Sequence, residues 1–76
     1  MKIKTFIIIV TYNGMKWLSK CLESCQPFNV IVVDNNSTDG TVAFIQNNFP
    51  EITLLQQKSN LGFGAANNVG ISYALK

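Results

Sequence analysis

Three short apolar runs, each followed by a segment of helical character, constrain the fold of this chain more than any other feature. The runs cover residues 4–10, 29–34 and 52–56, and they are rich in isoleucine, valine and leucine. Uninterrupted apolar runs of this length are typical of strands that are buried on both faces of a parallel sheet. The sequence therefore predicts three parallel strands.

Each strand is expected to lead into a helix. Residues 15–25 carry apolar side chains at the spacing of one helical face, and Pro27 ends this helix because proline disfavours helical geometry in the residue before it. Residues 39–47 are expected to form a second, shorter helix that ends before Pro50, and residues 65–75 a third helix after a loop. Core-facing side chains of the third helix are expected at Val69, Ile71 and Tyr73.

Alternating strands and helices joined by short loops define an α/β architecture with right-handed crossovers. We expect a parallel sheet of strand order 3-2-1 in a three-layer, Rossmann-like half-domain (βαβαβα). The first strand then lies at an edge although residues 6–10 form the most apolar run, and such a strand requires a neighbour. We therefore expect residues 1–76 to be the N-terminal part of a longer domain, with the first strand covered by further chain or by self-association.

The residue types present exclude several functions. The chain has six lysines but no arginine, the residue that dominates bidentate contacts to phosphates and bases, so a nucleic-acid partner is not expected. It has no histidine, so neither a Ser-His-Asp nor a Cys-His catalytic set can be assembled. Cys21 and Cys25 lie outside the CxxC spacing and are expected as small core residues in a reducing compartment. The longest apolar run is far shorter than the ~20 residues that span a bilayer.

Polar residues and glycines are concentrated directly after the three predicted strands. These segments are residues 11–14, 34–40 and 60–64. In open parallel sheets, ligands bind beyond the carboxyl ends of the strands. The sequence therefore predicts one ligand-binding edge that is formed by the three loops together.

Several residues of this edge have two open interpretations. Asp34 is able to accept hydrogen bonds from a ribose or a base, or to fix its own loop by accepting backbone donors, and the two roles are compatible. Tyr12 either stacks on a base or packs against the first helix. The polar residues at the start of the second helix are expected to cap this helix rather than to contact a ligand. They are Ser37, Thr38 and Asp39.

Common nucleotide and metal motifs are not matched in full. Residues 62–67 read GFGAAN, but Asn67 replaces the third glycine of a GxGxxG fingerprint, and the segment follows the third strand instead of the first. A glycine-containing loop that leads into a helix N-terminus is still able to approach a diphosphate. Of the four carboxylates, only Asp34 and Asp39 are near the predicted edge, so no metal cluster is expected.

Four segments, in their order and spacing, resemble the N-terminal half of a family 2 glycosyltransferase of the GT-A fold. They are IIIVTYNG, WLSKCLESC, VIVVDNNSTDGT and NLGFGAANNVGI, and the resemblance extends over residues 7–75. The third and fourth segments are most similar to rhamnosyltransferase-type members of bacterial polysaccharide assembly. The resemblance implies that the chain is an incomplete GT-A fold that holds the nucleotide of a UDP- or dTDP-sugar donor.

The resemblance also implies roles for particular residues. Thr11 and Tyr12 match positions that line the base pocket, and Asp34 matches a position that contacts the base or ribose. Asn35 stands where many members have a second aspartate that reads a uracil N–H, and its amide leaves uracil and thymine open. The ribose-diphosphate side is expected to be lined by Gly62, Gly64 and Asn67, with Asn68 as a further candidate.

The family's metal motif and catalytic base are not matched by any part of this sequence. The Asp-x-Asp motif of the family follows the helix with which this chain ends, and the base lies further on. The resemblance therefore implies no catalytic residue and no metal ligand in residues 1–76, and Mg²⁺ or Mn²⁺ is expected only in the longer enzyme. That enzyme would act on a saccharide or lipid-linked acceptor, in the cytoplasm or at the inner face of the cytoplasmic membrane, and the segment alone is expected to be inactive.

Two alternative classes remain open. A non-catalytic α/β nucleotide-sensing or regulatory module, such as a receiver domain, would need acidic residues near the end of the first strand, where this chain has Thr11. A nucleotidyltransferase with a similar half-fold would need a glycine- and arginine-rich loop at that place, and the chain has no arginine. The sequence therefore favours a glycosyltransferase segment over both.

Overall fold

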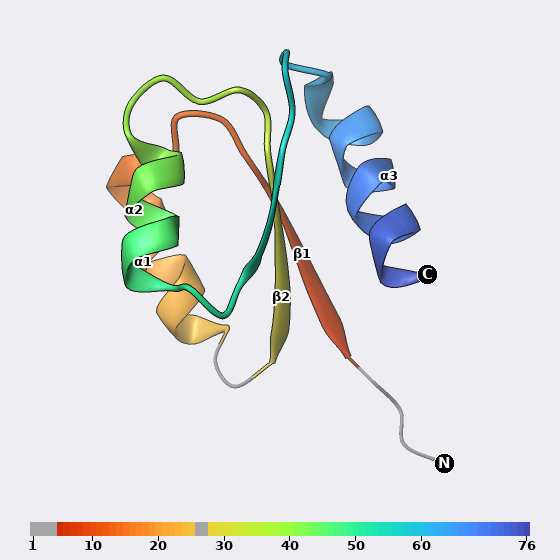
Figure 1. The fold of residues 1–76 in the computed structure, drawn as a ribbon, viewed down its shortest axis with the longest axis horizontal. Helices are drawn as coiled ribbons and strands as arrows, with labels where there is room; N and C mark the ends of the chain where they lie inside the picture. Colours follow the sequence, from red (N-terminus) through yellow and green to blue (C-terminus); the bar gives the residue numbers. More distant parts are fainter. Residues whose placement is uncertain (1–4, 26–27) are drawn as a thin grey trace.

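A computed structural model of the chain describes residues 5–25 and 28–76. Strands and helices alternate in the order β1 (Phe6–Thr11), α1 (Met15–Ser24), β2 (Asn29–Asp34), α2 (Thr41–Asn48), β3 (Thr53–Gln56) and α3 (Gly62–Ala74). The strands pair in parallel in the spatial order β1-β2-β3, with α1 and α2 on one face of the sheet and α3 on the other (Figure 1). The predicted three-layer α/β half-domain with strand order 3-2-1 is confirmed. The expected strand start at Lys4 and helix stop at Pro27 lie outside the described residues.

The central strand β2 is buried on both faces. Val30 and Val32 point to the layer of α1 and α2, whereas Ile31 and Val33 point to α3. All four side chains are buried, as expected for a strand with a neighbour on each side and helices on each face. The continuous apolar run in the sequence therefore has a direct structural cause.

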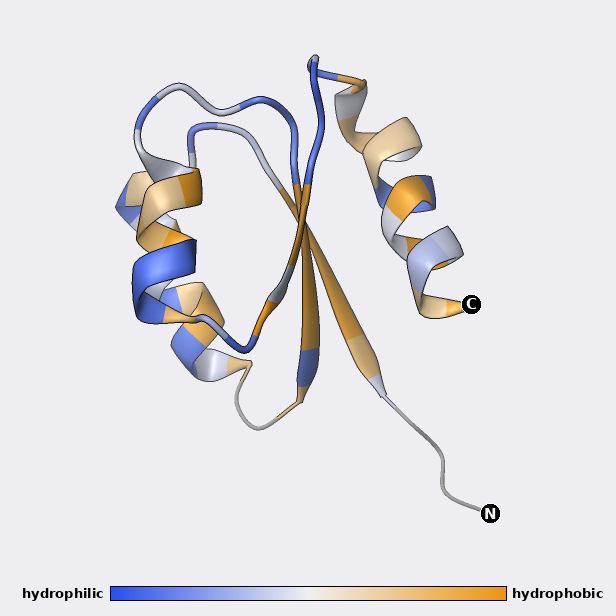
Figure 2. Ribbon diagram, in the orientation of Figure 1, coloured by the Kyte–Doolittle hydropathy of each residue, from blue (hydrophilic) through white to orange (hydrophobic). Residues whose placement is uncertain are grey.

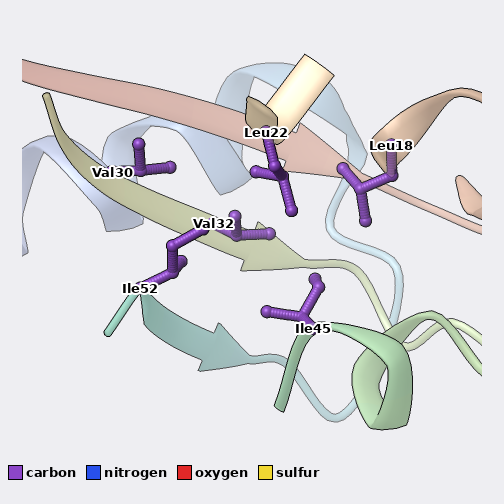
Figure 3. Packing of buried hydrophobic residues seen from close by; sticks show 6 residues of the cluster. All are labelled: Leu18, Leu22, Val30, Val32, Ile45 and Ile52. Atoms are coloured by element: carbon purple, nitrogen blue, oxygen red, sulfur yellow. The ribbon is translucent and has the colours of Figure 1, made fainter. Parts of the chain in front are cut away.

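The first core lies between the sheet and the two helices α1 and α2 (Figure 3). Leu18 and Leu22 of α1 are completely buried, and Ile45 of α2 meets them from the neighbouring helix. Their spacing of four residues places both leucines on one face of α1, as predicted. Trp17, in contrast, is 46% exposed and lies outside this core.

Both cysteines are free thiols on or beside this core-facing stripe of α1. Cys25 packs against the first core, and Cys21 is half-buried. Burial, followed by the proximity of Cys25, raises the pKa of the Cys21 thiol above its ordinary value. A thiol with a raised pKa stays protonated at neutral pH, which fits the predicted packing role better than a nucleophilic one.

The second core lies between the sheet and α3, and small residues form the helix side of it. Ala66 and Gly70 are the buried residues of α3. Ile71 and Tyr73 are 41% and 45% exposed, so the expectation that they face the core was wrong. The reason is the close approach of α3 to the sheet: a Cβ atom at Gly70 would lie 2.6 Å from Cγ2 of Ile8.

Gly70→Ala is expected to destabilise the fold by about 1–3 kcal/mol, because the new methyl group would overpack the contact with β1 and β2. The same substitution at Gly64 provides a matched control, since a Cβ atom there would have no neighbour within 4 Å and both glycines belong to α3. We expect Gly64→Ala to be neutral or stabilising by up to about 1 kcal/mol. Thermal denaturation measures the melting temperatures of both variants. Equal melting temperatures would contradict the close packing of Gly70 against the sheet.

Two helices begin at positions other than those predicted. α3 starts at Gly62 instead of residue 65, because the side chain of Asn60 accepts a hydrogen bond from the Gly62 N–H at 2.8 Å and closes a turn at the helix entrance. α2 starts at Thr41 instead of residue 39, since Gly40 adopts a left-handed backbone with φ 89°. Both differences follow from local turn chemistry that apolar periodicity does not report.

The first strand lies at the open edge of the sheet. Its residues Ile7, Ile8, Ile9 and Val10 are half-buried, whereas the residues of β2 beside them are buried. Figure 2 shows β1 as apolar along most of its length. The need for a covering neighbour or for self-association stays a prediction. Within the described residues, no helix combines the length and apolarity needed to cross a membrane.

Candidate functional site

The polar residues that follow the three strands meet at one edge of the sheet. Figure 1 shows the loops after β1, β2 and β3 at the top of the fold, and Figure 2 shows these loops in blue and grey, in contrast to the orange strands below them. We call residues 11–14 loop 1, residues 35–40 loop 2 and residues 57–61 loop 3. Parallel pairing brings the loops together, because Thr11 is in register with Asp34, and Asp34 with Gln56.

Asp34 is buried and its carboxylate is engaged by its own loop. Oδ2 accepts a hydrogen bond from the backbone N–H of Ser37 at 2.9 Å, and Oδ1 accepts one from the Ser37 hydroxyl at 2.6 Å. Of the two interpretations of Asp34, the structure shows the one in which the carboxylate fixes loop 2. Contact with a ligand through its remaining lone pairs stays a prediction.

Loop 1 is tied to loop 2 through Asn13 and Ser37. The backbone N–H of Asn13 donates to the Ser37 hydroxyl at 2.8 Å, and Oδ1 of Asn13 accepts from the Thr38 N–H at 2.7 Å. Asn13 has a left-handed backbone with φ 53°, which asparagine tolerates better than most residues do. Ser37 and Thr38 therefore join two loops instead of capping a helix.

Asp39 connects the N-termini of two helices. Its Oδ2 accepts from the N–H of Met15, the first residue of α1, at 3.2 Å, and its Oδ1 accepts from the N–H and the hydroxyl of Thr41 at the start of α2. A carboxylate in this position satisfies free helical N–H groups and opposes the positive end of each helix dipole. The interpretation of Asp39 as a capping residue is confirmed by these bonds.

The effect of Asp39 on stability should depend on pH. The hydrogen bond from the Thr41 hydroxyl is the largest cause that holds the pKa of Asp39 below its ordinary value, and the N–H groups of Met15 and Thr41 act in the same direction. Because the pKa is lower in the folded state, the stabilisation is complete above the unfolded pKa of about 4 and is lost as the pH falls through the folded pKa. The difference in melting temperature between wild type and Asp39→Asn should therefore shrink in acid, and a pH-independent difference would contradict the assignment.

Asn35 ties loop 3 to the same edge. Its side-chain Nδ2 donates to the carbonyl of Gly62, and its Oδ1 accepts from the N–H of Leu61, each at 3.3 Å. Its backbone N–H donates to the carbonyl of Thr11 at 2.9 Å. Asn35 is buried, so both ends of its amide are occupied by the protein, and reading of a base edge stays a prediction.

The two residues at the end of β1 differ in exposure. Thr11 is buried, and its hydroxyl has no hydrogen-bond partner among the residues that the structure describes. Gly14 leaves room for this hydroxyl, because a Cβ atom there would lie 2.3 Å from Thr11 Oγ1. Tyr12 is 52% exposed at the tip of loop 1, which is compatible with stacking on a ligand and not with burial against α1.

The three remaining predicted residues lie in the first two turns of α3. Gly62 has a left-handed backbone with φ 80°, and open space surrounds Gly64 where a side chain would begin. Asn67 is half-buried one turn further along. The helix start brings Gly62 next to loop 2 through its bond with Asn35, whereas no such bond is formed by the side chain of Asn67 in the described part of the chain.

Two features of this edge escape sequence reasoning. The sequence pattern assigns Asn13 only to a loop, although it makes two of the bonds between loops 1 and 2. Phe63 is 72% exposed in the first turn of α3, next to Gly62. The Asn-Gly pair at residues 13–14, just beyond the end of β1, is a turn signal that could have pointed to the role of Asn13.

The described residues offer no metal site. Residues 5–25 and 28–76 contain no group of three or more histidine, cysteine or acidic side chains placed to hold an ion. The two carboxylates near the edge are occupied, Asp34 by Ser37 and Asp39 by Met15 and Thr41. The donor set present here therefore does not fit the divalent cation that the family resemblance implies.

A groove of about 580 Å³ runs along β3 and α3 and adjoins the edge only at Gln56 and Gln57. Leu55 and Val69 line its apolar part, and Tyr73 and Lys76 lie in its wall. Asn68, the further candidate for the ribose-diphosphate side, lines this groove, whereas the seven main predicted site residues do not. The polar edge formed by the three loops is therefore the candidate functional site.

The fold is an α/β half-domain whose polar loops gather beyond the carboxyl ends of parallel strands, the place where ligands bind in open sheets of this kind. Residues 6–76 match the model of one protein family, described as glycosyl transferase family 2. The chain belongs to this family.

Curated relatives are longer glycosyltransferases. The chain is 41% identical over 68 residues to the SPbeta prophage-derived glycosyltransferase SunS of Bacillus subtilis (strain 168), an alignment that covers 87% of this chain and 16% of the relative. It is 36% identical over 67 residues to an N-acetylglucosaminyl-diphospho-decaprenol L-rhamnosyltransferase of Mycobacterium tuberculosis (strain CDC 1551 / Oshkosh), covering 82% of this chain and 22% of the relative. The chain therefore spans less than a quarter of the length of these two relatives.

Proposed function

We propose that this segment forms the nucleotide-binding side of a longer glycosyltransferase. That enzyme transfers a sugar from a UDP- or dTDP-sugar to a saccharide or lipid-linked acceptor in the synthesis of a cell-surface glycan. Membership of glycosyl transferase family 2 supports the reaction class. One observation carries the nucleotide role: three polar loops are joined into one edge by hydrogen bonds in which the side chains of Asn13, Asn35 and Ser37 take part.

The chemistry of the edge fits a nucleotide better than an apolar ligand. The exposed ring of Tyr12 offers a stacking surface for a base, and aromatic stacking does not depend on which base is bound. The free lone pairs of Asp34 would accept from a base or ribose donor. The start of α3, with Gly62 and Gly64, would approach the diphosphate, since helix N-termini favour negative charge. Thr11, Asn35 and Asn67 complete the proposed contact set.

Other parts of the reaction are assigned to residues outside this segment. The described residues contain no group of three or more histidine, cysteine or acidic side chains that could bind a divalent cation. We therefore propose that the ligands of the cation belong to the remainder of the enzyme, as does the base that accepts the proton of the acceptor hydroxyl. We place the enzyme in the cytoplasm, where nucleotide sugars would reach it, or at the inner face of the membrane that holds a lipid-linked acceptor.

Titration of the 76-residue chain with nucleotides tests the proposed role. Amide spectra recorded with UDP and with dTDP should show changes confined to loops 1, 2 and 3 and the first turn of α3, and inorganic phosphate should produce fewer of them. Changes restricted to the groove beside Val69 and Tyr73, or no changes at all, would contradict the proposal. A further titration with a UDP-sugar tests the alternative, since a non-catalytic sensing module would bind the free nucleotide as well as it binds the nucleotide sugar.

The 76-residue chain is expected to transfer no sugar by itself, because the described residues provide neither a metal site nor a histidine base. The chain would be incubated with a panel of nucleotide sugars, Mn²⁺ and saccharide acceptors, and nucleoside diphosphate release would be measured. Release above that of a reaction without protein would show that the segment is catalytically complete.

A further inference from the structure

We propose that Asn13 and Ser37 are positioning residues that lock loop 1 to loop 2 and thereby hold the exposed ring of Tyr12 in one orientation toward the ligand. This inference rests on the proposed function, because the ligand in question is the nucleotide. It adds two residues that the family resemblance did not assign to the site.

The Ser37 hydroxyl is the centre of this lock. Its oxygen accepts from the backbone N–H of Asn13 at 2.8 Å, while its proton is donated to Oδ1 of Asp34 at 2.6 Å. A hydroxyl that accepts and donates at once links three residues of this edge. Loss of this one oxygen would leave a donor of loop 1 and a carboxylate oxygen of β2 without their partners.

Asn13 closes the lock from the other side. Its Oδ1 accepts from the Thr38 N–H at 2.7 Å, so the two loops are joined by a bond in each direction. The left-handed backbone of Asn13, φ 53°, is the turn that brings both its N–H and its side chain to loop 2. A β-branched residue in this conformation would be strained, so the choice of residue is narrow.

The backbone of Tyr12 is held in place because hydrogen bonds anchor the residue on each side of it. On one side, the carbonyl of Thr11 accepts from the N–H of Asn35 at 2.9 Å. On the other side, Asn13 is held by Ser37 and Thr38. Tyr12 itself is 52% exposed, so its ring extends from an anchored backbone into solvent at the candidate site.

Ordering a flexible loop on binding costs free energy and so weakens the affinity. A loop backbone that is already ordered before the ligand binds avoids most of this cost. An unlocked loop 1 would let Tyr12 sample other directions, and the nucleotide would have to select one of them. We therefore expect the lock to act on affinity more than on overall stability. The expected loss for one broken lock bond is about three- to tenfold in nucleotide affinity.

Substitutions at Asn13 separate the side-chain bond from the backbone conformation. Asn13→Gly keeps the left-handed backbone accessible but removes the Oδ1 acceptor, whereas Asn13→Asp keeps an acceptor and also tolerates this backbone. Ser37→Ala removes the bridging hydroxyl. Ser24→Ala is the matched control, because the Ser24 hydroxyl donates only to the carbonyl of Lys20, on the exposed side of α1.

The experiment measures three quantities for the full 76-residue chain and these variants: amide hydrogen exchange, affinity for UDP and dTDP, and melting temperature. In Asn13→Gly, we expect exchange of the Thr38 amide to accelerate at least about tenfold. We expect affinity to fall in Asn13→Gly and Ser37→Ala, to return in Asn13→Asp, and to stay unchanged in Ser24→Ala. Affinity that falls only in proportion to the melting temperature would indicate a structural role alone and overturn the proposal.

The possible failures are distinguishable. If the unmodified chain binds no nucleotide, the proposed function fails, and the positioning role falls with it even where exchange shows that the lock exists. If the chain binds nucleotide but Asn13→Gly and Ser37→Ala bind it equally well, the proposed function stands and the positioning role is overturned. If exchange of Thr38 is unchanged in Asn13→Gly, the lock itself is overturned.

Discussion

Leu22→Ala is expected to lower the free energy of unfolding by about 2–5 kcal/mol. Leu22 is completely buried on α1, and its truncation leaves a cavity beside Leu18, Ile45 and the central strand. The packed sheet and the neighbouring helix limit how far the surrounding side chains can move in to fill this cavity. Small domains have total stabilities of only about 5–15 kcal/mol, so this one substitution removes a large part of the stability of a 76-residue chain.

Chemical denaturation of wild type, Leu22→Ala and Leu75→Ala measures the effect. Leu75 provides a matched control with the same chemical change, since it is 81% exposed at the end of α3. We expect its substitution to change stability by at most about 0.5 kcal/mol. Equal losses in the two variants would mean that the core between the sheet and α1 is not the main source of stability.

Asp34→Asn is expected to weaken both the fold and nucleotide binding. The carboxylate accepts two hydrogen bonds from Ser37, and an amide presents a donor where one of these bonds needs an acceptor. Loss of a hydrogen bond to a charged group costs about 1.5–3 kcal/mol. Because the pair lies at the centre of the edge, the fall in melting temperature should be accompanied by faster exchange of the Ser37 amide.

Comparison with Ser37→Ala distinguishes the two open roles of Asp34. If Asp34 only holds loop 2, Asp34→Asn should lose no more nucleotide affinity than Ser37→Ala, because Ser37→Ala removes the bond to Asp34 and also the bond from the Asn13 N–H. If Asp34 also contacts the nucleotide, Asp34→Asn should lose more, by about tenfold or more for a charged hydrogen bond. Glu23→Gln, which makes the same carboxylate-to-amide change at an exposed position on α1, controls for the loss of one negative charge. An equal loss of nucleotide affinity in Glu23→Gln and Asp34→Asn would contradict a direct contact between Asp34 and the nucleotide.

The sheet and the meeting of the polar loops at one edge could be predicted from the sequence, because both depend on patterns that extend over many residues. Continuous apolar runs identified the strands, and the alternation with helices fixed the strand order in which β2 is central. Polar loops after all three strands then had to share one edge, as Thr11, Asp34 and Gln56 do in the observed register. No single residue had to be interpreted correctly for these predictions to hold.

Contacts that depend on one atom could not be predicted in the same way. Apolar periodicity favours large side chains, so it assigned Ile71 and Tyr73 to the core and overlooked Ala66 and Gly70, on which α3 actually packs. Likewise, a set of polar residues does not tell which ones bind a ligand and which bind each other. Asn35 illustrates this, because its amide is engaged by the backbone of Leu61 and Gly62.

The reciprocal bonds between Asn13 and loop 2 have a consequence for how such a sequence changes over evolutionary time. A change of Ser37 to a residue without a hydroxyl removes the acceptor of the Asn13 N–H. A later change at position 13 then alters the free energy of unfolding by a different amount than it would in the original chain. The order in which substitutions arrive therefore matters, and each accepted change alters which next ones are tolerated. In loops 1 and 2, the residues freest to vary are the exposed ones whose side chains make no hydrogen bond to another segment within the described part of the chain: Tyr12, Asn36 and Thr38.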